Sequence, residues 1–216
     1  MMKNDWSILD GFYNELKQDV YEQPDEEGRI GVSRDIIASA PIQGLKTVLD
    51  VGCGQGYAQE LFIGMEYIGI TLSEKEHREA VKLGRAVLEM DYNLIRLGRY
   101  FDLIFSSHAL EHSPLPLLTL MEWHRVGRNL LLIVPNPKHY GYIGRNHYSV
   151  SEPHQIRWWL RRAGWKVIWK KITDTDIAYY ANRMPRIGFE GWSKLEHDIY
   201  IADRDDKIYE EKKEEE

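Results

Sequence analysis

The sequence predicts an α/β fold with a mostly parallel sheet, and two observations carry this prediction. From residue 47 onward, short apolar runs bounded by turn residues alternate with stretches of helical period. Alternation of this kind builds right-handed βαβ units. The length of 216 residues and the 43% hydrophobic content suit one such domain with a small addition.

The first 44 residues are expected to form an N-terminal helical cap. One helix is predicted from apolar residues that recur at helical spacing: Leu9, Phe12, Tyr13, Leu16 and Val20. Residues 24–31 read as a polar loop. A second short helix is expected to start at Ser33, a good N-cap, and to end before Pro41.

Seven apolar runs are candidate strands of the sheet. They cover residues 47–51, 67–70, 86–90, 101–105, 130–134, 165–169 and 198–202. Between them, Ser73 and Glu76 form a capping box that starts one helix. Further helices are expected at 115–126 and 152–162. The domain is expected to span residues 45–204, with acceptor-loop insertions at 135–151 and 174–194, and a charged tail at 205–216.

The turn after the first strand is rich in glycine and reads Asp50-Val51-Gly52-Cys53-Gly54-Gln55-Gly56. Such a turn brings backbone N–H groups close to a ligand, and the helix that follows adds partial positive charge. A dinucleotide fingerprint would be Gly-x-Gly-x-x-Gly with an acidic residue after the second strand. Here the third glycine comes one residue early and Thr71 stands at the acidic position, so a nicotinamide cofactor is disfavoured.

Residues 48–56 resemble motif I of the class I S-adenosylmethionine-dependent methyltransferases, and the resemblance extends over about residues 45–170. It implies a Rossmann-like three-layer sandwich whose seven-stranded sheet is mostly parallel, with an antiparallel last strand. It also implies that Asp50 orders the turn and helps to hold the amino group of the cofactor S-adenosyl-L-methionine.

Two later segments extend this resemblance. Asp91 matches the acidic residue after the third strand that binds the adenine amino group, and residues 107–112 resemble the segment that lines the sulfonium end and the acceptor pocket. The expected cofactor-binding residues are therefore Asp50, Gly52, Cys53, Gly54, Gln55, Gly56, Thr71, Leu72, Asp91, Tyr92, Ser107 and His108.

The second strand departs from the common family pattern. Most members of the family carry Asp or Glu at the end of this strand, where it binds both ribose hydroxyls. Here the strand ends in Gly69-Ile70-Thr71-Leu72-Ser73, which resembles the variant of the cyclopropane-fatty-acid-synthase branch. Thr71 cannot bind both ribose hydroxyls. Either another residue such as Glu74 contributes, or ribose binding is weaker.

Residues 108–112, His-Ala-Leu-Glu-His, also fit the inverted zincin pattern. Zinc chemistry of that kind needs both histidines on one helical face, with Glu111 as the base. Pro114 and Pro116 leave hardly any room for such a helix. We therefore expect no metal. Cys53 is the only cysteine, so no intrachain disulfide can form, and a structural role suits it.

The loops after the fourth and fifth strands, residues 106–116 and 135–151, are expected at the mouth of the site, beyond the carboxyl ends of the strands. His147-Tyr148-Ser149 resembles a His-aromatic-Ser/Thr element of small-molecule methyltransferases. The candidate catalytic residues are His112, His147 and His108, since a near-neutral pKa suits a general base. For each of them, a structural or substrate-orienting role is the alternative.

The expected reaction is in-line transfer of a methyl group to O or N of a small-molecule acceptor, such as a metabolite, sugar or lipid intermediate. The net charge of −6 and the lack of an Asn/Asp-Pro-Pro-Tyr motif after the fourth strand argue against nucleic acid. No apolar run reaches the roughly 20 residues of a membrane span, and the first residues lack a signal peptide. A cytoplasmic monomer or homodimer is expected. The alternative is a catalytically silent S-adenosylmethionine-binding regulatory or scaffold protein.

Overall fold

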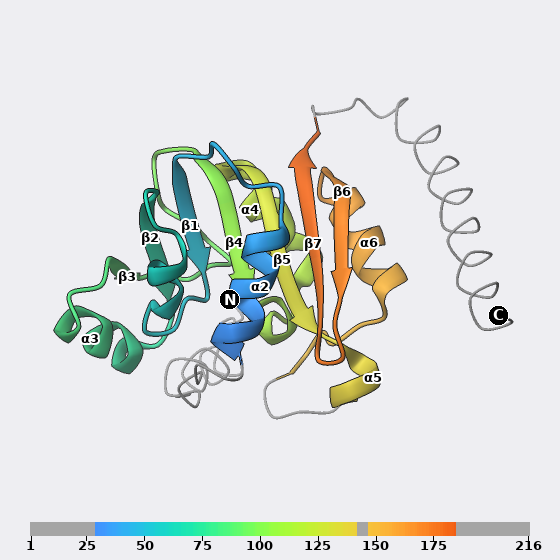
Figure 1. Cartoon of the computed structure of the whole chain (residues 1–216), viewed down its shortest axis with the longest axis horizontal. Helices are drawn as coiled ribbons and strands as arrows, with labels where there is room; N and C mark the ends of the chain where they lie inside the picture. Colours follow the sequence, from blue (N-terminus) through green and yellow to red (C-terminus); the bar gives the residue numbers. More distant parts are fainter. Residues whose placement is uncertain (1–28, 142–146, 185–216) are drawn as a thin grey trace, which may run out of the picture. The chain divides into compact units, whose positions relative to one another are not determined.

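The computed structural model describes residues 29–141 and 147–184, and these form an α/β domain around a seven-stranded sheet (Figure 1). The strand order is β3-β2-β1-β4-β5-β7-β6. The strands are β1 (Thr47–Val51), β2 (Glu66–Thr71), β3 (Val87–Glu89), β4 (Phe101–Ser107), β5 (Gly127–Pro135), β6 (Trp165–Ile172) and β7 (Asp176–Arg183). Neighbouring strands from β3 to β5 are parallel, and β7 runs antiparallel to both β5 and β6. The predicted fold class is confirmed.

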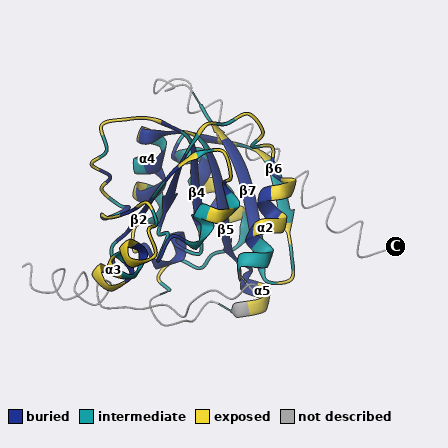
Figure 2. Ribbon diagram, turned by 60° about the vertical axis from the view of Figure 1, so that its left-hand side comes forward, coloured by how far each residue is buried: buried dark blue, intermediate teal, exposed yellow. Residues whose placement is uncertain are grey.

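Successive residues of the central strands enter two hydrophobic cores on opposite faces of the sheet. In β5, Leu130 and Leu132 belong to one core and Leu131 and Ile133 to the other. This alternation follows from the two-residue period of a strand. Because helices cover both faces, the strands are buried on both sides and have continuous apolar sequences. In Figure 2 they are dark blue, the colour of buried residues, at the centre of the molecule.

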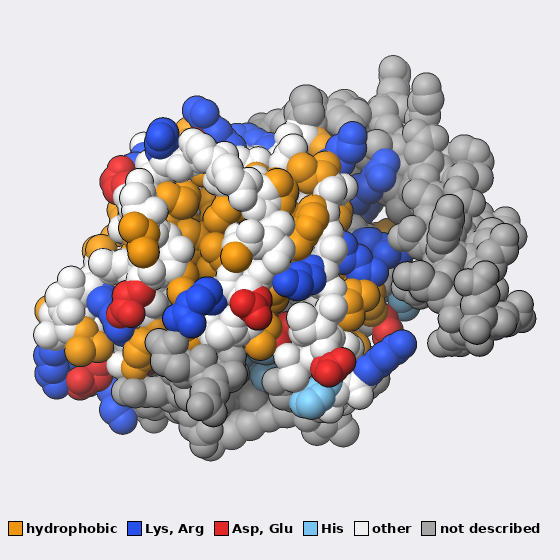
Figure 3. Space-filling view, in the orientation of Figure 1, with side chains coloured by type: hydrophobic (Ala, Val, Ile, Leu, Met, Phe, Trp, Pro, Cys, Tyr) orange, Lys and Arg blue, Asp and Glu red, His pale blue; other side chains and the backbone are white. Residues whose placement is uncertain are grey.

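Helices complete the two outer layers. Residues of α4 (Pro116–Val126) and α6 (Pro153–Arg162) enter the first core, and residues of α2 (Arg29–Ser39) enter the second. The remaining helices are α3 (Glu74–Lys82), the one-turn α5 (Pro137–Tyr140) and two 3-10 helices, η1 (Tyr57–Leu61) and η2 (Leu110–His112). On the side of α2, hydrophobic side chains reach the surface between scattered charges (Figure 3). None of the helices described is both long and apolar enough to cross a bilayer.

The strand order reverses between β1 and β4, because the chain moves outward from β1 to β3 and then returns to the other side of β1. The connections that follow β1 and β4 therefore run outward in opposite directions along the sheet from this point. In open α/β sheets this switch point is where ligands bind.

The seventh strand corrects one expectation. Residues 198–202, where that strand was predicted, lie outside the described residues, and the structure has β7 at Asp176–Arg183. The expectation of an acceptor loop over residues 174–194 is therefore wrong for residues 176–183, which form this strand. Ile177 to Ala181 is buried on both faces between β5 and β6, so it shows no alternation that would mark a strand.

Two shorter elements also differ from expectation. Helix α2 begins at Arg29, so Ser33 lies within the helix rather than at its N-cap, and the end of the expected loop 24–31 is helical. The glycine turn leads into the 3-10 helix η1, not into a regular α-helix. The expected helix at the start of the chain and the charged tail 205–216 lie outside the described residues.

Candidate active site

A pocket opens at the switch point, above the carboxyl ends of β1, β2 and β4. Its lining comes from the glycine turn, the end of β2, the loop after β4 and one side of α2 and η1. Among the lining residues are Asp50, Gly52, Cys53, Gly54, Gln55, Thr71, Leu72, Tyr92, Ser107, His108 and His112. Most residues that the sequence singled out are therefore brought together in one place.

Glycine is required at the start of the turn. Gly52 has φ 74°, in the left-handed region that disfavours side chains. A Cβ atom at Gly52 would also lie 2.4 Å from the Cβ of Ala109, in the loop after β4. The turn can therefore approach that loop closely only because Gly52 has no side chain, and this approach shapes the floor of the pocket.

Asp50 is a buried carboxylate at the end of β1, with 3% of its surface exposed. Its Oδ2 accepts a hydrogen bond of 2.6 Å from the hydroxyl of Tyr67 on β2. Burial raises the pKa of Asp50 from its ordinary value of 3.8 to about 7, although the Tyr67 hydrogen bond lowers it. Asp50 lines the pocket, so a cationic group of a ligand there would favour its ionised form.

Cys53 carries a thiol that is not activated. Burial raises its pKa well above the ordinary value, and the negative charges of Asp50 and Glu76 raise it further. A nucleophilic cysteine needs the opposite environment. The structural role expected for Cys53 agrees with these surroundings.

A second buried carboxylate, Glu76, reaches the pocket from the first turn of α3. Its Oε2 accepts a 3.0 Å hydrogen bond from the Thr71 hydroxyl, and its backbone N–H donates to Oγ of Ser73 at 3.3 Å, as the capping box predicts. Glu74, named as the residue that could compensate for Thr71, instead faces solvent and pairs with Arg78. That suggestion is corrected: the carboxylate beside Thr71 belongs to Glu76.

The segment after β3 contributes Tyr92 to the pocket, and the Tyr92 hydroxyl donates to the carbonyl of Ala109 at 3.2 Å. Asp91 is not among the lining residues. Its Oδ1 accepts hydrogen bonds from the backbone and side-chain amides of Asn93, at 2.8 and 2.9 Å. The adenine contact expected for Asp91 stays a prediction.

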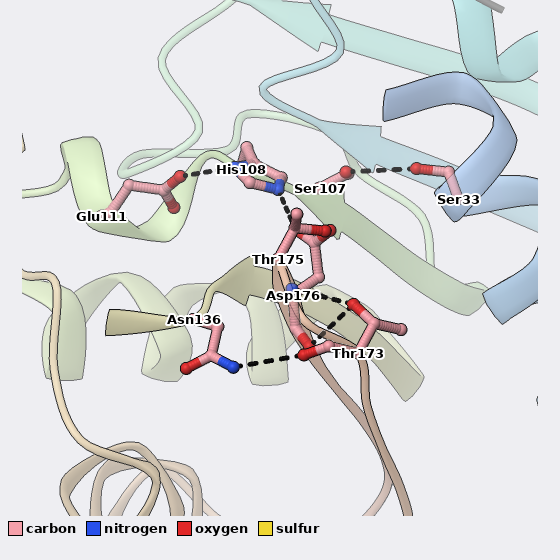
Figure 4. A network of polar contacts seen from close by, with 8 residues as sticks. All are labelled: Ser33, Ser107, His108, Glu111, Asn136, Thr173, Thr175 and Asp176. Carbon is pink, nitrogen blue, oxygen red and sulfur yellow. Dashed lines mark hydrogen bonds and ion pairs between the residues drawn. The ribbon is translucent and has the colours of Figure 1, made fainter. Parts of the chain in front are cut away.

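His108 lies at the end of β4, in a left-handed conformation with φ 52°. Its backbone N–H donates to the carbonyl of Ile133, so the chain is still held to β5 when it turns. Its Nε2 pairs with Oδ1 of Asp176, and its Nδ1 lies 3.3 Å from Oε1 of Glu111 (Figure 4). Both ring nitrogens of His108 thus face carboxylates.

Asp176 belongs to a polar network that ties β7 to the site. The backbone N–H of Asp176 donates to the Thr173 hydroxyl at 2.9 Å, and Nδ2 of Asn136 donates to the carbonyl of Thr173 at 3.2 Å (Figure 4). Ser107, just before His108, lies 3.4 Å from the hydroxyl of Ser33 on α2. Elements far apart in sequence therefore fix the position of the loop after β4.

Glu111 is buried in η2, with 1% of its surface exposed. Burial raises its pKa, but the contact with His108 and the charges of His108 and His112 outweigh it, so the pKa lies below its ordinary range. The three-residue η2 confirms that no zincin helix forms over residues 108–112. His108 and His112 do not share a helical face.

The two loops expected at the mouth meet at Glu111. Its carbonyl accepts hydrogen bonds from the backbone N–H groups of Tyr148 and Ser149, at 2.7 and 3.0 Å. These bonds bring the rings of His112 and His147 together, with centroids 4.8 Å apart. His112 lines the pocket and His147 lies beside it, whereas residues 142–146 of the same loop lie outside the described residues.

Sequence reasoning missed three residues of the site: Ser33, Glu76 and Asp176. The capping box had marked Glu76 as a helix-starting residue, and only its burial shows the carboxylate turned toward Thr71. Asp176 is 68 residues from His108, and no spacing in the sequence signals their pairing.

Comparison with known proteins agrees with this geometry. A family model described as a methyltransferase domain matches residues 49–130. No curated protein matches the chain.

This chain aligns with nearly the full length of several solved structures of similar fold. A SAM-dependent methyltransferase from Aquifex aeolicus is 23% identical, with 83% of this chain and 98% of that chain covered and a TM-score of 0.57. Magnesium protoporphyrin IX methyltransferase from Synechocystis PCC 6803, solved with bound SAM, is 18% identical, with 84% and 98% covered and a TM-score of 0.54. The cyclase SpnF is 14% identical, with 83% and 94% covered and a TM-score of 0.63.

Proposed function

We propose that this chain, a class I S-adenosylmethionine-dependent methyltransferase by its fold and by the methyltransferase-domain family that matches residues 49–130, methylates O or N of a small-molecule acceptor. The observation that carries the proposal is the pocket at the β1–β4 switch point, which joins the glycine turn, two buried carboxylates and the histidines after β4.

The carboxylates suit the two polar ends of the cofactor. Asp50, beside the glycine turn, pairs with the ammonium group of the methionine part. Glu76 accepts hydrogen bonds from the ribose hydroxyls, with Thr71 holding its carboxylate from the other side. A carboxylate with two oxygens can bind both hydroxyls, which Thr71 by itself cannot. In this proposal Glu76 therefore supplies the two-oxygen contact to the ribose that Thr71 lacks.

The histidines divide into two roles. Both ring nitrogens of His108 face carboxylates, so His108 positions the loop and does not take a proton from the acceptor. His112 and His147 lie together at the edge of the pocket and act on the acceptor. Their position, where residues 147–149 meet η2 in the loop after β4, fits a small molecule bound between these two segments.

In the reaction, a lone pair of the acceptor O or N attacks the methyl carbon in line with the bond to sulfur. The C–S bond breaks, its electron pair stays on sulfur, and S-adenosylhomocysteine leaves. The acceptor proton passes to water or to one of the two histidines. The sulfonium is already activated, so much of the acceleration comes from positioning and from the exclusion of water.

Residues 1–44 serve as a cap in this proposal, since Ser33 of α2 lines the pocket and contacts Ser107. A cytoplasmic location, a monomer or homodimer, and the absence of nucleic-acid partners stay predictions from the sequence.

Calorimetry with S-adenosylmethionine and S-adenosylhomocysteine tests the first half of the proposal, and release of S-adenosylhomocysteine with a panel of hydroxyl and amine acceptors tests the second. We expect binding of both ligands and turnover with at least one acceptor class. Failure to bind either ligand would contradict the proposal. Tight binding without turnover would favour the silent regulatory protein, and the cyclase of similar fold shows that this fold also supports other chemistry.

A further inference from the structure

Three side chains that can ligate a metal ion converge beside the pocket. They are Glu111 and His112 of η2 and His147 of the loop after β5, and one ligand atom from each lies within 4.8 Å of the others. This set differs from the zincin pattern in the sequence, because it replaces His108 with a residue 35 positions beyond His112.

We infer that Glu111, His112 and His147 bind a divalent transition-metal ion at the acceptor side of the pocket. Two imidazoles and one carboxylate form a ligand set that holds Zn²⁺ in hydrolases and Fe²⁺ in oxygenases, with open positions left for substrate. The inference deepens the proposed function and rests on it for the role of the ion, but not for the binding of the ion itself. With the ion bound, His112 and His147 act on the acceptor through the ion and take no proton from it.

The state of the Glu111 carboxylate is the second observation that points to a cation. Only 1% of Glu111 is exposed, and among the described residues no group donates a hydrogen bond to its Oε2. The 3.3 Å ion pair with His108 touches only Oε1. A buried carboxylate oxygen without a partner is costly. A cation between Glu111 and the two histidines would compensate for that cost.

The backbone holds the three ligands in place. His112 follows Glu111 directly in the chain, and the carbonyl of Glu111 accepts the N–H groups of Tyr148 and Ser149. The Ser149 hydroxyl donates to the carbonyls of Leu110 and Ser113, at 2.9 and 3.0 Å. These bonds fix His147 against η2, so the site needs only small side-chain movements to reach Zn–N distances of about 2.0–2.1 Å.

The neighbours of Glu111 suit an outer coordination shell. His108 contacts the carboxylate of Glu111 from one side and is itself held by Asp176 of β7. Chains of hydrogen-bonded groups that orient a ligand in this way are typical of metal sites. The Asp176–His108 pair therefore positions Glu111 and stays outside the coordination sphere.

The ion would select oxygen acceptors. A hydroxyl that binds an open position has a lower pKa and loses its proton to solvent near neutral pH. Its oxygen then forms the bond to the methyl carbon while the C–S bond breaks, with the electron pair left on sulfur. The acceptor class is thus a hydroxyl compound, and a neighbouring oxygen that also binds the ion would strengthen its binding.

The test uses the full-length, tag-free protein, stripped with a chelator and titrated with ZnCl₂ and MnCl₂ by calorimetry, with elemental analysis of the loaded protein. We expect one equivalent of at least one of these ions. His147→Ala should weaken binding by at least about tenfold, because loss of an outer-shell partner alone costs 10–100-fold. His154→Ala removes an exposed histidine of α6 and should bind as the wild type does.

His147 is partly exposed, so His147→Ala is expected to fold, and a thermal melt checks this. Glu111→Gln keeps the shape of the buried side chain and should also lose the ion. No stoichiometric ion in the wild type, or equal affinity in His147→Ala, would overturn the inference. S-adenosylhomocysteine binding, measured on the same metal-free protein, separates this outcome from failure of the proposed function.

Discussion

Substitution of Tyr67 by Phe should shift the pH dependence of cofactor affinity to higher pH. In the unliganded protein Asp50 has a pKa of about 7, raised from 3.8 by burial and lowered by the Tyr67 hydrogen bond. The proposed pairing with the ligand ammonium requires ionised Asp50. Binding below pH 7 therefore releases a proton from Asp50, and affinity should increase as the pH rises toward 7.

The magnitude follows from the 2.6 Å hydrogen bond between Tyr67 and Asp50. A hydrogen bond to a charged group contributes roughly 1.5–3 kcal/mol. One pKa unit corresponds to about 1.4 kcal/mol, so Tyr67→Phe should raise the pKa of Asp50 to roughly 8–9. At pH 7 the ionised fraction then falls about 5–50-fold, and the affinity should fall by the same factor.

Stability should respond in the opposite sense to binding. A carboxylate whose pKa is raised in the folded state favours folding while it is protonated. That contribution is fully present below the unfolded pKa of 3.8 and is lost as the pH rises through about 7. The unliganded wild type should therefore become less stable over this range, in part through Asp50.

Calorimetry with S-adenosylhomocysteine between pH 6 and 9.5 measures the effect. The ratio of wild-type to Tyr67→Phe affinity cancels titration of the ligand amino group, and it should shrink from about 10–100 at pH 6 to less than about twofold at pH 9.5. Tyr57→Phe is the control, because the Tyr57 hydroxyl donates to Oε1 of Gln55 and not to Asp50. This substitution should leave the pH profile of the affinity unchanged. A ratio that does not change with pH would refute the reasoning.

Three further substitutions test the site. Glu76→Ala should weaken S-adenosylhomocysteine binding roughly 10–100-fold, because charge-assisted hydrogen bonds to the ligand are lost. Glu74→Ala, at an exposed position of the same helix, should leave the affinity unchanged. Equal effects of the two substitutions in calorimetry would contradict the role of Glu76. Gly64→Ala, the control, should lower the free energy of unfolding by roughly 1–3 kcal/mol, because its backbone is left-handed. Gly52→Ala should lower it by roughly 1–3 kcal/mol more, because the new Cβ would lie 2.4 Å from that of Ala109. Urea denaturation compares the two variants, and equal losses of stability would refute the close approach. Asp176→Asn should destabilise the fold by roughly 1.5–3 kcal/mol, because the buried contact between His108 and the carboxylate is lost. An unchanged denaturation midpoint would show that this contact contributes nothing.

The fold class and most residues that line the pocket could be predicted from local patterns. Parallel strands buried on both faces read as apolar runs, and the glycine turn is a contiguous motif whose backbone conformation requires glycine at Gly52. Because carboxyl ends of parallel strands meet at one edge, the residues after β1, β2 and β4 had to lie together. The pocket confirms this for Asp50, Thr71 and Ser107.

Other features depend on which residues meet across the fold. Strand β7 lies between two other strands and faces a core on each side. Its sequence therefore shows no alternation of apolar and polar residues and resembles an irregular loop. Glu74 and Glu76 differ only in the face of α3 on which they lie. That face is set by how the helix packs on β2 and β3, and it turns Glu76 toward the pocket and Glu74 toward solvent.

The sequence by itself determined the βαβ order, the glycine turn and which histidines lie near the pocket. Only the tertiary structure decided which groups surround these histidines. Asp176 reaches His108 across 68 residues, and hydrogen bonds to the Glu111 carbonyl bring His147 to His112. Periodicity and spacing describe neighbours along the chain, whereas the pKa, partners and ligands of a buried side chain depend on groups that only folding brings within a few ångströms.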